Sequence, residues 1–278
     1  MLLCYNDISK NMELNQLIIL IKGGGEIASA VAHRLWFSGF RYICMTEVPE
    51  PTAVHRGTTF SEAVFDGEKT VEGLTAKLID SNEQVHDVWA DGKIPLIIDP
   101  EASIIDYIHP HVVIDAIMAK KNLGTKMSDA SLVVGIGPGF EAGEDVDLVI
   151  ETYHNEKLGR VISSGKAEPD NQIPFNIGGY TYERAIHAPV AGEFKAIKNL
   201  CDTVAAGDEV ASVGGQAVKA EIGGIIRAIL RDGLTINKGT KIVEIDPTGD
   251  MEVCFIIRAK MRAIAGGVLE AVLMSFNS

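Results

Sequence analysis

The chain lacks any long hydrophobic run. No stretch of its 278 residues approaches the roughly 20 apolar residues that a helix needs to cross a bilayer. The longest early run, Leu17 to Ile21, has the length of a strand. The first sixteen residues contain Asp7 and Glu13 and lack the basic region and apolar segment of a secretory signal. We therefore expect a cytoplasmic protein with no membrane partner.

Cysteine is scarce and scattered. The four cysteines are Cys4, Cys44, Cys201 and Cys254, and no two of them form a CxxC pair. Without an export signal they are expected to be reduced thiols. Their spacing does not support a clustered zinc site, so no bound metal is expected.

An excess of basic residues is absent as well. The chain has 25 Lys and Arg against 38 Asp and Glu, a formal net charge of -13. A general nucleic-acid binder needs a basic surface to displace phosphate counterions, so no nucleic-acid partner is expected. Apolar residues make up 46% and charged residues 23% of the chain, which is typical of a globular protein rather than a disordered one.

The first half begins with a strand, a glycine turn and a helix. The apolar run Leu17 to Ile21 is typical of a parallel strand covered on both faces. After Lys22-Gly23-Gly24-Gly25, residues Glu26 to Ser38 have helical periodicity and end at Gly39, a suitable C-cap. A second apolar run, Tyr42 to Met45, leads to Glu47.

This arrangement matches the dinucleotide-binding fingerprint. Gly23 permits the tight turn, Gly25 lets a pyrophosphate approach the backbone, and Ala28 allows close packing of helix and strand. The helix start then offers free N–H groups to an anion, and Glu47 can accept hydrogen bonds from ribose hydroxyls. The structural alternative is a glycine-rich turn that binds nothing.

Further strands and helices alternate along the chain, which favours a doubly wound parallel sheet. Asp99 and Asp115 fall at strand ends, where ligands of such sheets gather, although either residue can equally cap the next element. The expected strands are Pro95 to Ile98, Val112 to Ile114, Leu132 to Val134 and Asp145 to Ile150, with helices near Asn82 to Ala90 and Ala102 to Ile108.

Two further segments are candidates for anion binding. Gly135, Gly137 and Gly139 alternate in a loop that can expose successive backbone N–H groups, and Lys120 follows the preceding strand. A tight turn into the next strand is the alternative. Arg56, with the hydroxyls of residues 58–61, can also contact an anion, unless it is a solvated arginine beside a helix start.

The second half repeats itself at an offset of 32 residues. One such unit cannot bury its apolar face alone, whereas two can close around a shared core, with glycines at the strand bends. The repeat therefore predicts a barrel with pseudo-twofold symmetry. The identical pairs are Gly192 and Gly224, Ala196 and Ala228, Ile197 and Ile229, Thr203 and Thr235, and Gly207 and Gly239.

This repeat resembles the biotinyl/lipoyl-type barrel-sandwich module. In that family a carrier lysine lies on the hairpin between the halves, usually in a Met-Lys-Met or Asp-Lys-Ala tripeptide. Here Val213-Gly-Gly-Gln-Ala-Val-Lys219 contains neither tripeptide and places Lys219 on the following strand. No biotin or lipoate is expected.

The predicted organisation has four parts. They are an N-terminal extension (1–16), a Rossmann-like α/β domain (17–180), a barrel-sandwich-like β domain (181–248) and a C-terminal strand and helical region (249–278). The last part contains helical segments Arg258 to Ala265 and Gly266 to Met274, and is expected to return to the α/β domain or to make a subunit contact in a homo-oligomer.

Six strings together resemble the YqeB-type family of selenium-dependent molybdenum hydroxylase accessory proteins, which is related in context to XdhC-type maturation factors. The resemblance implies a cofactor-handling role, a molybdopterin or molybdopterin dinucleotide ligand, and a molybdenum hydroxylase apoenzyme as partner. It supplies no catalytic residues. The strings are IKGGGEIASAVAHRL (21–35), TFSEAVFDG (59–67), IGPGFEAGEDVD (136–147), VIET (149–152), HAPVAG (187–192) and GGVLE (266–270).

Two other functions compete with this expectation. The glycine fingerprint also fits an NAD(P)-dependent oxidoreductase, in which Glu47 would favour NAD, although no paired hydride-site residues are evident. A carrier or scaffold protein that uses the barrel is the third possibility, and it lacks the carrier lysine.

Overall fold

Short apolar strands build the main sheet of this protein. The computed structural model describes residues 13–169 and 173–276. The strands of the sheet are β1 (Ile18–Lys22), β2 (Tyr42–Glu47), β3 (Glu68–Val71), β4 (Leu74–Ile79), β5 (Ile94–Ile98), β6 (Val112–Asp115), β7 (Leu132–Ile136), β9 (Leu148–Ile150) and β10 (Val161–Ile162).

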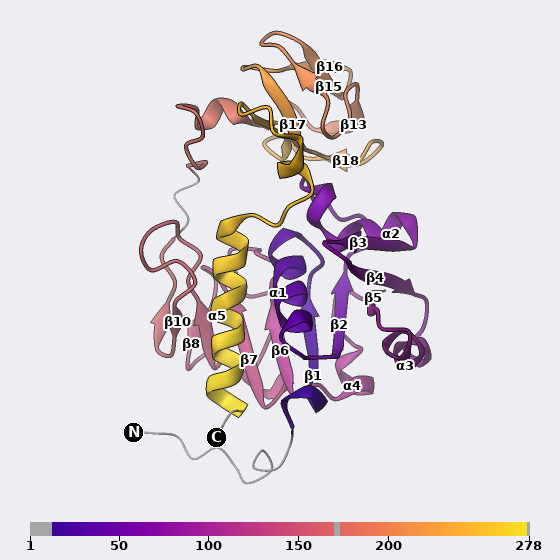
Figure 1. Ribbon diagram of the computed structural model, residues 1–278, viewed down its shortest axis with the longest axis vertical. Helices are drawn as coiled ribbons and strands as arrows, with labels where there is room; N and C mark the ends of the chain where they lie inside the picture. The colour runs from indigo at the N-terminus through magenta and orange to yellow at the C-terminus, as the bar shows by residue number, and fades with distance from the viewer. Residues whose placement is uncertain (1–12, 170–172, 277–278) are drawn as a thin grey trace.

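These nine strands lie in the order β10-β9-β7-β6-β1-β2-β5-β4-β3 (Figure 1). The edge strands β3 and β10 are antiparallel to their neighbours, and the strands between them are parallel. The strands expected from the sequence are present, and the expectation of an α/β protein with a large, mainly parallel sheet is confirmed.

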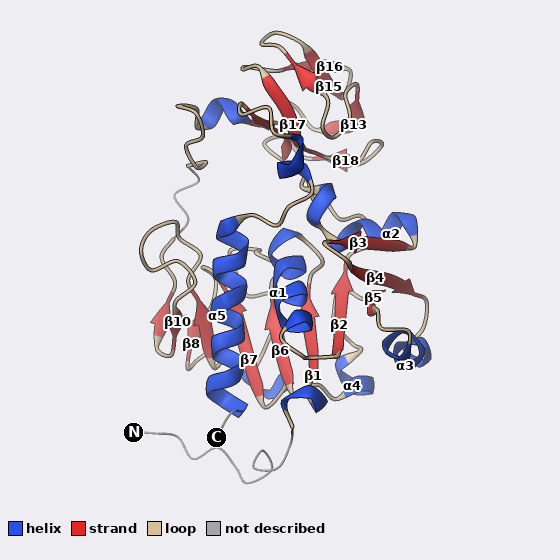
Figure 2. Ribbon diagram, viewed as in Figure 1, coloured by secondary structure: helices blue, strands red, loops and turns tan. Residues whose placement is uncertain are grey.

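Helices cover both faces of this sheet (Figure 2). Ile19 and Ile21 point into a core shared with α1 and α5, whereas Leu20 points into a second core shared with α3 and α4. All three side chains are fully buried, as expected for a strand covered on both faces. The helices are α1 (Glu26–Phe37), α2 (Ala63–Asp66), α3 (Val85–Ala90), α4 (Ile105–Ile108) and α5 (Ala259–Phe276).

The carboxyl ends of the parallel strands form one edge of the sheet. From β1 the chain passes to β2 on one side and later returns to β6 on the other, so the strand order reverses between β1 and β6. Open α/β sheets bind ligands at such a reversal. Both glycine loops lie at this edge, because one follows β1 and the other follows β7.

Two four-stranded antiparallel sheets make up the β domain, which lies above the carboxyl edge in Figure 1. Their orders are β12-β19-β17-β14 and β16-β15-β13-β18, so each sheet combines strands from both sequence repeats. The strands are β12 (Ala185–His187), β13 (Gly192–Ala196), β14 (Thr203–Val204), β15 (Glu209–Val213), β16 (Gln216–Lys219), β17 (Gly224–Ile229), β18 (Thr235–Ile236) and β19 (Lys241–Asp246).

The repeat is visible in the backbone. Strands β13, β14 and β15 begin at residues 192, 203 and 209, and β17, β18 and β19 begin 32 positions later. Gly192 and Gly224 have nearly the same φ, +151° and +152°. A Cβ on Gly224 would lie 2.3 Å from the Asp246 carbonyl oxygen, so the crossing of β17 and β19 requires glycine. Lys219 ends strand β16, as the sequence predicts.

The C-terminal region differs from its prediction in two respects. Among the described residues of 249–278 there is no strand, only η7 (Met251–Cys254) and α5. The two helical segments expected to meet at Gly266 are one continuous helix, which packs against α1. A Cβ on Gly267 would lie 2.0 Å from the Gly159 carbonyl oxygen, so this glycine permits close packing rather than a break.

Smaller features complete the fold. Strands β8 (Glu141–Ala142) and β11 (Gly165–Lys166) pair as a separate two-stranded sheet. Of the predicted N-terminal extension, residues 1–12 and with them Cys4 lie outside the described residues, and Leu14–Gln16 forms a short 3-10 helix. In the part of the chain that the structure describes, no helix combines the length and apolar character needed to cross a membrane.

Candidate functional site

The glycine turn after β1 is tied to neighbouring strands. Gly23 has a φ of +95° and donates its backbone N–H to the Thr46 carbonyl oxygen at 2.9 Å. A Cβ on Gly24 would lie 3.1 Å from both a Glu47 carboxylate oxygen and the Ser61 backbone nitrogen. The left-handed backbone of Gly23 and the tight surroundings of Gly24 therefore explain the first two glycines of the turn without a ligand.

Glu47 closes this turn with its side chain. Its Oε2 accepts a hydrogen bond from Gly24 N, and its Oε1 accepts one from Val48 N, both at 2.8 Å. Burial raises the pKa of the Glu47 carboxyl, against the lowering effect of the two amides. A carboxylate offers about four acceptor positions, so the two amides orient Glu47 and leave acceptor positions for a ligand hydroxyl.

Gly25 is the open position of the turn. It is the N-cap of α1, with φ -66° and ψ -172°, and no side chain caps the helix there. A Cβ on Gly25 would meet nothing within 4 Å. The first N–H groups of a helix have no intrahelical partner and carry the positive end of its dipole. This is where an anionic ligand would approach the backbone, while Ala28 lies fully buried in the core.

Two buried hydroxyls lie beside the turn without a hydrogen-bond partner. They are Thr59 Oγ1 and Ser61 Oγ. Ser61 also donates its backbone N–H to the Gly24 carbonyl oxygen at 2.9 Å, which places it against the turn. Buried polar atoms are normally paired. Because both side chains are fully buried, an enclosed water is the partner expected for such hydroxyls.

A buried lysine lies at the reversal of strand order. Lys22 Nζ donates to Thr125 Oγ1 at 2.6 Å, and Thr125 Oγ1 donates to Asp115 Oδ2 at 2.6 Å. Lys22 Nζ lies 3.7 Å from the same Asp115 oxygen. All three residues are buried. The strand ends of β1 and β6 are thus joined by an ammonium–hydroxyl–carboxylate chain directly before Gly23.

The second glycine loop is filled by the protein itself. A Cβ on Gly135 would lie 2.5 Å from the Phe140 ring, and one on Gly137 would lie 2.8 Å from Thr152 Oγ1. A Cβ on Gly139 would lie 2.7 Å from the Lys121 backbone nitrogen. Close packing explains why glycine stands at these three positions, and their anion-binding role stays a prediction.

The two basic candidates differ in their surroundings. Arg56 Nε donates to Glu62 Oε2 at 2.8 Å, so its charge is paired with a buried carboxylate, while 29% of its side chain is exposed. Lys120 is exposed in the loop after β6, with a left-handed φ of +60°. Neither residue is brought into contact with Gly25 or Glu47 by any hydrogen bond or ion pair among the described residues.

A cluster of charged residues joins the two domains above the start of α1. His55 Nε2 lies 3.2 Å from Glu244 Oε2 of the β domain and 3.8 Å from Glu26 Oε2 of α1. Arg258, between β19 and α5, binds the Glu26 carboxylate through two nitrogens. Its third nitrogen lies 3.7 Å from Glu244 Oε1. The cluster connects the helix start to the β domain.

Burial and charge set the protonation of this cluster. Burial lowers the pKa of His55, since a desolvated imidazolium is costly. Burial alone raises the pKa of the Glu244 carboxyl, but His55, Lys241 and Arg258 outweigh it and hold this pKa well below its usual range. The cluster therefore holds Glu244 as a carboxylate.

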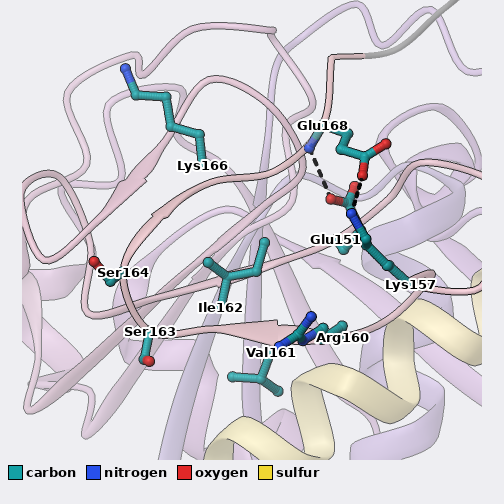
Figure 3. Close-up of a pocket in the computed structure, with 9 residues that line it drawn as sticks. All are labelled: Glu151, Lys157, Arg160, Val161, Ile162, Ser163, Ser164, Lys166 and Glu168. Atoms are coloured by element: carbon teal, nitrogen blue, oxygen red, sulfur yellow. Dashed lines mark hydrogen bonds and ion pairs between the residues drawn. The ribbon is translucent and has the colours of Figure 1, made fainter.

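A pocket of about 340 Å³ lies at the β9–β10 edge of the sheet (Figure 3). Lys157 pairs with Glu168 at 2.7 Å, and Lys166 pairs with Glu141 at 2.9 Å, so two of its lining cations are neutralised. The Glu151 carboxylate accepts the Glu168 backbone N–H at 2.8 Å. This pocket is separate from the Gly25 turn, and sequence reasoning did not identify it.

Two further contacts were not predicted from the sequence. One joins Lys22 to Thr125, and the other joins His55 to Glu244. Thr125 meets Lys22 across 103 positions of sequence, and Glu244 lies in the other domain from His55. The only local signal was a lysine directly before the glycines, in a strand otherwise apolar.

The chain is similar in sequence to a known protein. No protein-family model matches the chain. It is similar to the uncharacterized protein YqeB of Escherichia coli (strain K12). The two are 44% identical over 257 residues, which cover 92% of this chain and 47% of YqeB. The chain thus spans about half the length of this curated relative.

Likeness to solved structures is weak. The apo ectoine utilization protein EutE (DoeB) from Ruegeria pomeroyi has a TM-score of 0.26 and 9% identity, with 83% of this chain and 86% of that one covered. An aspartoacylase family protein from Mesorhizobium loti has a TM-score of 0.24 and 9% identity, with 76% and 58% covered. At such scores these likenesses carry no argument about function.

Proposed function

We propose that this chain is an accessory factor for the maturation of selenium-dependent molybdenum hydroxylases and binds a nucleotide-containing molybdopterin cofactor at the Gly23–Gly25 turn. Within this proposal the α/β domain is Rossmann-like and the β domain is barrel-sandwich-like. The observation that carries the proposal is the position of Glu47, held by the amides of Gly24 and Val48 beside the uncapped, open Gly25.

The turn matches the two polar parts of a dinucleotide. A pyrophosphate would lie over Gly25 and accept hydrogen bonds from the first amides of α1, since no side chain occupies that position. A ribose would donate hydroxyls to the remaining acceptor positions of Glu47.

Two carboxylates near the turn, Glu26 and Asp115, are each paired with a cation. Glu26 stands in the first turn of α1, where a carboxylate would repel phosphate, but Arg258 binds it in bidentate fashion. Lys22 adds a buried positive charge behind the turn, shared with Asp115. The net positive end of the α1 dipole therefore remains available to the ligand.

The role proposed is binding and delivery, with a molybdenum hydroxylase apoenzyme as the receiving partner. The molybdopterin would supply the redox chemistry in that enzyme, and the residues of this chain would bind and orient its nucleotide part. The similarity to YqeB and the six sequence strings support this role. No catalytic residue is assigned.

Calorimetric titration under anaerobic, reducing conditions tests the proposal. Molybdopterin cytosine dinucleotide should bind saturably to the wild-type chain. Glu47→Gln should weaken binding about 10- to 100-fold, because a hydrogen bond to a charged group contributes about 1.5–3 kcal/mol. Gly266→Ala, in α5 with no atom within 4 Å of the new Cβ, is the matched control and should bind like the wild type.

Parallel titrations with NAD and NADP distinguish the proposed function from that of an NAD(P)-dependent oxidoreductase. Binding of NAD alone, with the same loss in Glu47→Gln, would replace the proposal with the oxidoreductase alternative. Absence of saturable binding by all three dinucleotides would refute a dinucleotide site at this turn.

A further inference from the structure

Cys201 and Cys254 lie together although they are far apart in the sequence. Cys201 N donates to the Ile226 carbonyl oxygen at 2.8 Å, and Cys254 Sγ lies 3.7 Å from the same oxygen. Cys201 also acts electrostatically on the Cys254 thiol. Both cysteines therefore lie against the Ile226 carbonyl oxygen, next to strand β17.

The two thiols differ in access. Cys201 is partly exposed, and its Sγ lies 3.7 Å from the Met251 carbonyl oxygen. Cys254 is 3% exposed. Burial, together with the neighbouring Cys201, raises the pKa of the Cys254 thiol to about 12. A reagent from solvent would thus meet Cys201 first, since thiol reactivity follows access and thiolate content.

The buried guanidinium of Arg227 lies near Cys254, and one of its nitrogens has no hydrogen-bond partner. Arg227 follows Ile226 on β17, and its charge acts on Cys254. Arg227 Nη1 binds Asp246 Oδ2 at 3.1 Å, whereas its buried Nε has no hydrogen-bond partner. The Arg227 charge favours the Cys254 thiolate that disulfide exchange requires, against the larger opposing effect of burial.

We propose that Cys201 and Cys254 form a thiol–disulfide exchange site for small disulfides. The Cys201 thiolate attacks one sulfur of the small disulfide, forms a mixed disulfide and releases the first thiol. Cys254 passes its proton to the thiolate released in the first step, attacks the sulfur of Cys201 and releases the second thiolate, which takes a proton from solvent. One disulfide is consumed and one is formed, and two electrons pass from the protein to the small disulfide.

The disulfide between Cys201 and Cys254 would make the junction of the two domains more rigid. A Cβ on Gly57 would lie 2.0 Å from the Cys254 carbonyl oxygen, so the backbone of Cys254 rests on the segment that carries His55 and Arg56. The internal disulfide would join the loop before β14 to this point. The inference is independent of the proposed dinucleotide site.

Oxidised glutathione, added to the full chain in a Cys4→Ser background, tests the proposal. After acid quenching and alkylation, tryptic digestion should yield residues 199–219 joined to residues 242–258 by a disulfide. Cys254→Ala should stop at a mixed disulfide that carries one glutathione on Cys201. Cys201→Ser should react at least about tenfold more slowly than the parent, because the accessible thiol is gone.

Circular dichroism of each variant establishes that it is folded, and Cys201→Ala replaces Cys201→Ser if the latter is not. Two results would overturn the inference. One is a parent protein that keeps glutathione on Cys201 without forming the internal disulfide. The other is a folded Cys201 variant in which Cys254 reacts as fast as in the parent.

Discussion

His55 of the α/β domain lies 3.2 Å from Glu244 of the β domain, between Nε2 and Oε2. Both side chains are buried, and Glu26 and Arg258 complete the cluster. The contact makes the junction of the two domains sensitive to protonation, because neither group can exchange its partner for water.

The junction should weaken in acid. The folded-state pKa of His55 is lowered, so below its usual pKa of 6.5 the unfolded chain binds a proton more readily than the folded one. Stability is therefore lost as the pH falls from that value through the folded pKa. Within this window the loss is about 1.4 kcal/mol per pH unit. The free energy of unfolding, measured with urea at several pH values between about 7 and 5, tests this expectation.

His55→Gln is the matched variant for this measurement. It keeps a polar side chain but removes the titration, so its free energy of unfolding should change less over the same pH interval. The depressed pKa of Glu244 acts in the same direction, with stability lost as the pH falls below the usual carboxyl value of 4.5. Equal pH slopes in wild type and variant would show that His55 does not titrate in this way.

Two adjacent glycines in α5 should respond in opposite directions to alanine. At Gly266 the new Cβ meets nothing within 4 Å, so Gly266→Ala should stabilise the helix by up to about 1 kcal/mol. At Gly267 it would lie 2.0 Å from the Gly159 carbonyl oxygen, so Gly267→Ala should destabilise by about 1–3 kcal/mol or more. Thermal or urea unfolding of both variants checks the pair. Similar effects at the two positions would contradict the close packing of α5 on Gly159.

Lys22 and Asp115 should show strong coupling. Lys22→Met leaves the buried Asp115 carboxylate without its countercharge and is expected to cost about 3–5 kcal/mol. Asp115→Asn in the same chain should recover part of this loss, because it removes the unpaired charge. A double-mutant cycle by urea unfolding measures the coupling. Additive losses would mean that Lys22 and Asp115 do not stabilise each other.

Much of the fold followed from local patterns. Apolar runs predicted strands at Tyr42 to Met45, Val112 to Ile114 and Leu132 to Val134, because a strand covered on both faces has a nearly continuous apolar sequence. The observed strands start at the same residues and end one or two residues later. Self-similarity at 32 residues predicted the paired units of the β domain. Both signals lie within short segments and need no knowledge of tertiary contacts.

What the sequence does not reveal are the contacts between distant segments. The expected break of the C-terminal helix at Gly266 is absent, and the neighbouring Gly267 packs on Gly159. Gly137 packs beside Thr152, and its anion-binding role stays a prediction. The partners of Arg56 and Lys22 likewise depend on how the chain folds back. A glycine or a charge in a sequence does not reveal whether its neighbour is a ligand or the protein itself.

The most direct test of the central claim is the affinity of Gly25→Ser for molybdopterin cytosine dinucleotide, measured beside the stability of the variant. Serine is a better N-cap than glycine, and the extended backbone of Gly25 accepts it, so the variant should be at least as stable as the wild type. Its Cβ and hydroxyl would occupy the space above the first amides of α1. We predict at least about a tenfold loss of affinity, or about 1.4 kcal/mol. A stable Gly25→Ser protein that binds the dinucleotide as tightly as the wild type would contradict the account.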